Sequence, residues 1–174
     1  MMKNYLDKII ANEALTLEES YDAMLKIMSG KVSSILLAGF LTALKSKKET
    51  AEEIAGFVIA MREKSLKINV DDAIDVCGTG GDSSGTFNIS TAVSFVVAGA
   101  GVRVAKHGNR SVSSNSGSAD VLKELGVNIE MNPALAEKSL NEINITFLFA
   151  PLYHPAMKYA AETRKELGMR TAFN

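Results

Sequence analysis

The spacing of apolar residues divides the chain into a helical first part and a second part in which strands and helices alternate. Amphipathic helices are predicted behind the capping boxes Thr-Leu-Glu-Glu at 16–19 and Thr-Ala-Glu-Glu at 50–53, and over residues 34–47. The first of these helices should stop near Gly30. The apolar residues expected to face a core are Tyr21, Met24, Leu25, Met28, Ile35, Leu36, Phe40, Leu44, Ile54, Phe57, Val58 and Met61. We therefore predict a small helical bundle domain over residues 1–67.

From residue 68 onward, short apolar runs alternate with helical patterns. Strands are predicted at 73–76, 102–105 and 145–150. Helices are predicted at 90–101, at 119–125 behind an N-cap at Ser118, from Asn132-Pro133 to about Glu142, and from His154-Pro155 to Leu167. This alternation favours an α/β domain with a mainly parallel sheet and ligand-binding loops at the carboxyl ends of its strands. So few strands make the α/β domain over 68–174 look incomplete.

Composition excludes several classes of protein. The 174 residues are 47% hydrophobic, which is enough for a packed core, and the net charge of −1 gives no overall attraction to nucleic acid or an anionic membrane. The lone cysteine, Cys77, excludes an internal disulfide and fits a reducing compartment. We see no signal peptide and no long uncharged apolar stretch, so we expect a soluble cytoplasmic protein.

The stretch between Asp82 and Asp120 differs in charge from the chain as a whole. This stretch contains no acidic residue, but it contains Arg103, Lys106 and Arg110 with nine serines and five glycines. Backbone N–H groups, hydroxyls and cations without carboxylates favour a polyanionic ligand, such as a phosphate or diphosphate.

Two loops around the helix at 90–101 are candidates for this ligand. Gly-Thr-Gly-Gly-Asp at 78–82 matches neither the dinucleotide fingerprint nor the P-loop, and a tight strand-to-helix turn is the alternative interpretation. Asn-Ile-Ser-Thr at 88–91 opens the helix, where Ser90 and Thr91 can bind phosphate or Mg²⁺ or act as ordinary caps.

The segment Lys-His-Gly-Asn-Arg-Ser-Val-Ser-Ser at 106–114 is the second candidate loop. A lysine at a strand end would point its cation into the crevice, and the hydroxyls of Ser111, Ser113 and Ser114 would form a nest around an anion. A solvated polar loop explains any one of these residues but explains all of them together poorly. The role of His107 stays open between base, hydrogen-bond donor and stacking surface. Arg164 is either a carboxylate-binding residue or a surface arginine.

Taken together, these motifs closely resemble the anthranilate phosphoribosyltransferase family. The resemblance covers the whole chain and rests on residues 78–82, 88–91 and 106–120, and on His-Pro-Ala-Met at 154–157 through Arg164 to Arg-Thr-Ala-Phe-Asn at 170–174. It implies a small helical domain and a larger α/β domain of the nucleoside phosphorylase type, with the active site between them. It also implies a Mg²⁺-dependent glycosyltransferase of tryptophan biosynthesis, a homodimer formed through the helical domain, and anthranilate synthase as a candidate partner.

The resemblance also assigns site residues. Lys106 and Asn109 would be catalytic, and Ser90 would ligate Mg²⁺. Anthranilate would contact Gly78, Asn109 and Arg164, with His107 and His154 beside its path. Phosphoribosyl diphosphate would contact Gly78, Gly81, Asp82, Thr86, Asn88, Ile89, Ser90, Thr91, Lys106, His107, Gly108, Asn109, Arg110, Ser111, Val112, Ser113, Ser114 and Ser118.

One difference from the family changes the expectation for activity. Family members are much longer, and an Asp-Glu pair in their second half ligates Mg²⁺, whereas this sequence contains no Asp-Glu dipeptide. We therefore expect a truncated enzyme that binds substrates weakly and turns over little. The alternatives are a related phosphoribosyltransferase or nucleoside phosphorylase reaction, and a non-catalytic paralogue that binds nucleic acid through the basic stretch 103–110.

Overall fold

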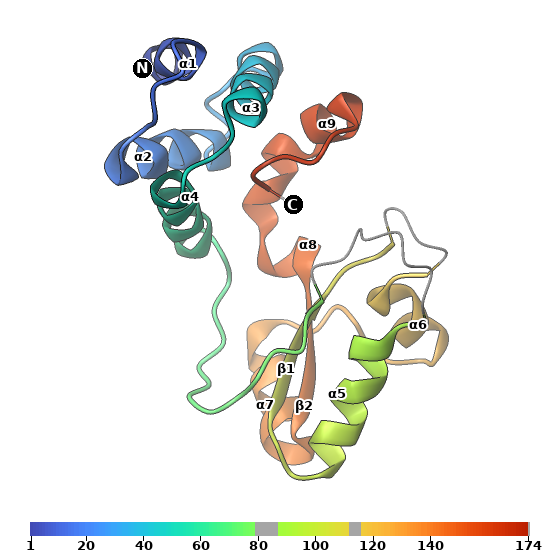
Figure 1. Cartoon of the computed structure of the whole chain (residues 1–174). Coiled ribbons are helices and arrows are strands. Elements are labelled where there is room, and N and C mark those ends of the chain that lie inside the picture. Colours follow the sequence, from blue (N-terminus) through green and yellow to red (C-terminus); the bar gives the residue numbers. More distant parts are fainter. Residues whose placement is uncertain (79–86, 112–115, 174) are drawn as a thin grey trace. The chain divides into compact units, whose positions relative to one another are not determined.

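The computed structural model describes residues 1–78, 87–111 and 116–173. The chain forms two compact units, one of Met1–Ser65 with His154–Asn174 and the other of Leu66–Tyr153. Figure 1 shows their elements along the chain. Residues 154–173 thus belong with the N-terminal helices, and the domain boundary predicted between residues 67 and 68 remains a prediction.

The first unit is a helical bundle. It contains α1 (Met2–Ile10), α2 (Leu17–Met28), α3 (Ser34–Lys47), α4 (Ala51–Glu63), a 3₁₀ turn (Pro155–Met157) and α9 (Lys158–Leu167). Both predicted capping boxes are present: the Thr16 and Thr50 hydroxyls accept from the N–H groups of Glu19 and Glu53. α2 packs against α4, and α9 packs against α2 and α3. The predicted helical bundle is confirmed.

The buried face of α4 differs from the predicted one. Glu53, Gly56, Phe57 and Ala60 are buried, whereas Ile54 and Val58 are about half exposed. The reason is the close approach of α2, because a Cβ on Gly56 would lie 2.4 Å from the carbonyl oxygen of Leu17.

The buried face of α3 was also predicted only in part. Phe40 and Leu44 are buried with Leu37 and Leu41, and Leu36 is partly buried against the same core. Ile35 is 85% exposed, so its prediction as a core residue is wrong.

The second unit is a small parallel α/β structure. Its strands β1 (Val104–Gly108) and β2 (Ile145–Phe149) pair in parallel, with Val104 opposite Ile145 and Gly108 opposite Phe149. The predicted strand at 73–76 appears only as an isolated bridge from Ile74 to Val104. β1 begins two residues later than predicted and includes Lys106 and His107.

Helices of the second unit pack on this strand pair. They are α5 (Ile89–Gly99), α6 (Ser118–Glu124), α7 (Pro133–Ile143) and α8 (Ala150–Tyr153). α5 contacts both strands and α7 contacts β2, while Phe147, Leu148 and Phe149 lie in the core with Ala119 and Leu122. In the part of the chain that the structure describes, no helix has the length and apolar character needed to span a membrane.

Candidate functional site

The carboxyl end of β1 is the centre of the candidate site. Lys106 is only 4% exposed, and its ammonium donates a hydrogen bond to the carbonyl of His107 at 3.2 Å. The strand predicted at 102–105 extends further in the structure, so Lys106 is a buried residue within β1, and its predicted role at the strand end stays a prediction. Gly108 allows the strand end to lie close to its neighbours, since a Cβ there would be 2.3 Å from the Ser118 hydroxyl and 2.4 Å from the Phe147 ring.

Asp75 connects this strand end to the segment before the first glycine loop. One carboxylate oxygen accepts from the N–H groups of Cys77 (2.9 Å) and His107 (3.2 Å), and the other lies 3.0 Å from Nδ1 of His107. Burial alone would raise the pKa of Asp75, but the hydrogen bonds from the His107 ring and from both backbone N–H groups outweigh it and lower that pKa. Sequence analysis had not identified Asp75, although it is the lone charge in the apolar run at 73–76.

The N-terminus of α5 lies beside the same segment. A Cβ on Gly78 would be 3.3 Å from the Ser90 hydroxyl, so the Gly78 backbone and Ser90 are neighbours. The side chain of Asn88 does not cap α5 and instead donates to the carbonyl of Ser116 at 3.2 Å. Asn88 therefore links the start of α5 to the segment before α6, and the start of α5 keeps the positive end of its helix dipole without an acidic residue.

A second carboxylate closes the loop that follows β1. Asp120 accepts from the N–H groups of Ser111 (2.9 Å) and Gly117 (2.8 Å), and these bonds lower the pKa of Asp120. The N–H of Ala119 donates to the carbonyl of Asn109 at 3.2 Å. The two ends of the loop are thus fixed by backbone hydrogen bonds. Gly117, not Ser118 as predicted, occupies the N-cap position.

The basic stretch 103–110 is only partly available for ligands. Arg103 forms a salt bridge with Asp72 and a hydrogen bond with the side chain of Asn141. Arg110 is exposed, and its guanidinium lies 5.9 Å from the centre of the Phe149 ring. Because Arg103 is already paired, this stretch fits a local anion site better than a continuous nucleic-acid surface.

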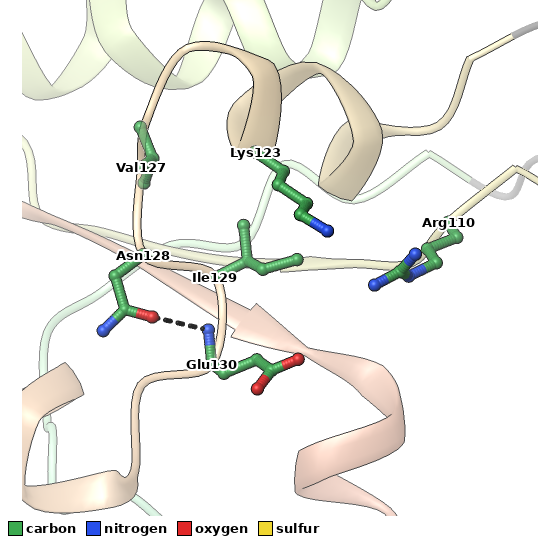
Figure 2. A pocket seen from close by; sticks show the side chains of 6 residues that line it. All are labelled: Arg110, Lys123, Val127, Asn128, Ile129 and Glu130. Carbon is green, nitrogen blue, oxygen red and sulfur yellow. Dashed lines mark hydrogen bonds between the residues drawn. The ribbon is translucent and has the colours of Figure 1, made fainter.

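Two cavities of the second unit are lined in part by predicted site residues, and sequence analysis indicated neither cavity. Figure 2 shows the first, of about 350 Å³, where Arg110 and Lys123 extend toward the same space and Glu130 lies below them. The second has a volume of about 190 Å³ and is lined by Lys106, Ser94 and Thr146 among others. The hydroxyl of Thr146 is buried and has no hydrogen-bond partner among the described residues.

Arg164 and His154 belong to the helical unit. Arg164 on α9 is half buried, its guanidinium lies 5.6 Å from the centre of the Phe173 ring, and its Nε has no hydrogen-bond partner among the described residues. Burial lowers the pKa of this guanidinium, which nevertheless stays charged. A half-buried cation with an unsatisfied donor is suited to a carboxylate ligand, so the surface-arginine interpretation fits less well. His154 is half buried and immediately precedes the 3₁₀ turn.

The predicted diphosphate contacts fall into two groups. The second unit brings Gly78, the start of α5, residues 106–111 and Ser118 together around the end of β1. The remaining ones, Gly81, Asp82, Thr86, Val112, Ser113 and Ser114, lie outside the described residues. No cluster of three or more His, Cys, Asp or Glu side chains suited to a metal occurs within the residues that the structure describes. Ser90 as a ligand of Mg²⁺ stays a prediction.

Comparison with known proteins agrees with this architecture. The helical bundle domain of a glycosyl transferase family matches residues 3–65, and the a/b domain of the same family matches residues 70–174. The chain thus contains both domains of this glycosyl transferase family.

Sequence relatives narrow the family. Over its whole length the chain is 56% identical to the anthranilate phosphoribosyltransferase of Petrotoga mobilis, spanning 51% of that protein. It is 52% identical to the enzyme of Bacillus caldotenax, of which it spans 72%. The chain belongs to the anthranilate phosphoribosyltransferase family. It spans about half the length of most of the curated relatives it matches, including the 53% identical protein of Geobacillus stearothermophilus.

Solved structures give the same result. The chain matches the anthranilate phosphoribosyltransferase of Thermus thermophilus with a TM-score of 0.90 at 44% identity, covering 97% of this chain and 52% of that one. It matches the Saccharomyces cerevisiae enzyme in complex with PRPP and Mg with a TM-score of 0.89 at 30% identity, covering 99% and 52%. A helical domain followed by a parallel α/β domain is therefore confirmed as the fold.

Proposed function

We propose that this chain carries the phosphoribosyl diphosphate-binding part of an anthranilate phosphoribosyltransferase. The observation that carries the proposal is that Lys106 lines the same cavity as Thr91 at the start of α5, where Ser90 lies beside the Gly78 backbone. Lys106, Ser90 and Thr91 all belong to a stretch free of acidic residues. The relatives named above support the choice of this enzyme among phosphate-binding proteins.

Lys106 and the start of α5 would bind the diphosphate. A nearly buried ammonium is costly without a counter-charge, and the described hydrogen bond of Lys106 is to a neutral carbonyl. A diphosphate oxygen would supply that charge. The hydroxyls of Ser90, Thr91 and Ser118, with the positive end of the α5 dipole and the side chains of residues 109–110, would bind the remaining oxygens.

Mg²⁺ fits this arrangement as an ion that the protein and the substrate would bind together. Ser90 offers one hydroxyl oxygen beside the Gly78 backbone, and Mg²⁺ commonly completes its coordination with phosphate oxygens and water. When bound, the ion would offset the charge that develops on the departing diphosphate. The S. cerevisiae structure in complex with PRPP and Mg supports this cofactor.

Anthranilate would bind through the residues that the family resemblance assigns to it. Arg164 would bind its carboxylate, and Asn109, Gly78, His107 and His154 would line its path. An aromatic amine is neutral near pH 7, so the residues have mainly to align it with C1 of the ribose while the C1–oxygen bond to diphosphate breaks. Lys106 would stabilise the leaving group through its charge, and Asn109 would assist it.

Exposed apolar side chains support a homodimer formed through the helical unit. Ile35 on α3 and Ile54 and Val58 on α4 are exposed, although they are large and apolar. An Ile35→Glu variant should shift the mass measured by light scattering from dimer to monomer. Anthranilate synthase is the partner we propose for channelling anthranilate to this site.

Calorimetric titration of the 174-residue chain with phosphoribosyl diphosphate tests the proposed function. We expect binding that strengthens with Mg²⁺ and weakens at least about tenfold in Lys106→Met, since a charge-assisted bond contributes about 1.5–3 kcal/mol. Lys138→Met is the matched control, because Lys138 is an exposed residue of α7 that pairs at 3.9 Å with Glu142. An absence of binding, or equal losses in both variants, would refute the assignment.

Turnover by the same sample is a separate question. We expect little loss of anthranilate fluorescence in the presence of phosphoribosyl diphosphate and Mg²⁺, because the sequence lacks the Asp-Glu pair expected to ligate Mg²⁺ in the family. Clear turnover would show that these carboxylates are dispensable.

A further inference from the structure

The contact between Asp75 and His107 can determine which ring nitrogen of the histidine carries the proton. Asp75 lies in the segment before the first glycine loop, and His107 lies in β1. Both side chains are partly exposed. Asp75 contacts His107 twice, through the backbone N–H and through Nδ1 of the ring. The backbone contact fixes the position of the carboxylate relative to the ring, so that the ring contact has a defined partner.

The protonation of the ring follows from the chemistry of this partner. An ionised carboxylate can only accept hydrogen bonds, and the bonds around Asp75 favour its ionised form. Nδ1 of His107 must then carry a proton to donate across the 3.0 Å contact. In a neutral ring, the proton on Nδ1 leaves Nε2 as a hydrogen-bond acceptor.

We propose that Asp75 is a positioning residue that keeps His107 in the tautomer with its proton on Nδ1, presenting Nε2 as an acceptor at the end of β1. If the proposed function holds, on which this part of the inference rests, Nε2 would accept a hydrogen bond from the substrate amine. Asp75 itself would not touch the substrate.

Nuclear magnetic resonance of the intact 174-residue chain tests this assignment directly. The chain contains two histidines, so ¹⁵N-histidine labelling gives two ring systems, and a His154→Gln variant assigns them. Long-range ¹H–¹⁵N spectra would be recorded well above the ordinary histidine pKa of about 6.5, so that the neutral ring is observed. We expect the spectra of His107 to show a proton on Nδ1 and none on Nε2.

The variants separate positioning from a structural role. In Asp75→Ala the ratio of the two tautomers should shift by at least about tenfold toward the form with its proton on Nε2, as loss of a charge-assisted hydrogen bond implies. Asp72→Ala is the matched control, because Asp72 lies three residues earlier and pairs with Arg103 instead. It should leave the His107 spectrum unchanged.

Each outcome decides the inference. A wild-type ring with its proton on Nε2, or a ratio that Asp75→Ala leaves unchanged in the folded chain, would overturn it. The spectra require no substrate, so they stand or fall separately from diphosphate binding. A positive tautomer result with no calorimetric binding would reject the proposed function but keep the positioning role of Asp75.

Discussion

Glu53 is the most deeply buried charge of the helical unit and the best point at which to perturb it. Its side chain is fully buried at the start of α4, and its carboxylate accepts from the N–H groups of Leu15 (3.0 Å) and Thr50 (2.8 Å). The Lys47 ammonium donates to the same carboxylate at 2.8 Å, from a side chain that is only 6% exposed. Glu53 thus connects the end of α3, the start of α4 and the chain before α2.

Glu53→Gln should destabilise the protein strongly. The amide nitrogen cannot accept a hydrogen bond, so one of these donors loses its partner, and Lys47 keeps a buried charge without a counterion. Removing one partner of a buried ion pair costs about 3–5 kcal/mol. With a urea dependence of about 2 kcal/mol per molar, the unfolding midpoint followed by far-UV circular dichroism should fall by roughly 1.5–2.5 M.

Glu19→Gln is the matched control, because Glu19 pairs with Lys8 at 2.8 Å on the surface. Such a pair contributes about 0.2–1 kcal/mol, and the glutamine keeps an oxygen for the capping box. Adding Lys47→Met to Glu53→Gln should recover part of the loss, since no buried charge is then left unpaired. A Glu53→Gln loss no larger than that of Glu19→Gln would refute this account.

The pH dependence provides a second check on Glu53. Burial would raise its pKa, but the hydrogen bonds from Lys47, Leu15 and Thr50 outweigh burial and lower it. A carboxyl whose pKa is lower in the folded than in the unfolded state stabilises the fold above its unfolded pKa, about 4.3. This stabilisation is lost as the pH falls toward the folded pKa. The stability difference between wild type and Glu53→Gln should therefore shrink below about pH 4.

Four further substitutions test the other parts of the structure. Gly117→Ala should destabilise the second unit by about 1–3 kcal/mol in urea unfolding, because a Cβ there would lie 2.3 Å from the backbone nitrogen of Ser111. Thr146→Val should raise stability by about 1 kcal/mol in thermal melting, since its hydroxyl is buried without a partner among the described residues, and Ser20→Ala should act likewise. In a complete relative, replacing the arginine that corresponds to Arg164 by alanine should raise the free-energy barrier given by kcat/KM for anthranilate by about 2–5 kcal/mol. The kcat/KM for the diphosphate sugar should stay nearly unchanged. Equal losses of kcat/KM for both substrates would refute the assignment of Arg164.

Local chemistry explains which parts of the fold the sequence could predict. The capping boxes at Thr16 and Thr50 and the left-handed glycines at Gly30 and Gly168 depend on residues within one turn, so they were predicted at nearly the right positions. The exposed side of α4 was not predicted, because it depends on the distance between α2 and α4 at Gly56. Hydrophobic spacing records which residues are apolar but not how closely two helices approach each other.

The same contrast applies to the candidate site. Glycine- and serine-rich motifs predicted a site at the end of a strand and the start of a helix, and the structure has the end of β1 and the start of α5 at these motifs. The burial of Lys106 was missed because it depends on the pairing of β1 with β2. Asp75 was missed because its partner His107 lies 32 residues away in the sequence and reaches it only by folding.

Two carboxylates outside the basic, hydroxyl-rich stretch accept hydrogen bonds from its backbone N–H groups. Asp75 and Asp120 flank the segment from the first glycine loop to α6, and both accept bonds from backbone N–H groups of that segment. A carboxylate that accepts backbone N–H groups holds the described residues beside it in place, while of the segment's cations Arg103 is paired with Asp72 and Lys106 donates to a neutral carbonyl. The stretch without acidic residues is thus held, at His107, Ser111 and Gly117, by two carboxylates that lie outside it.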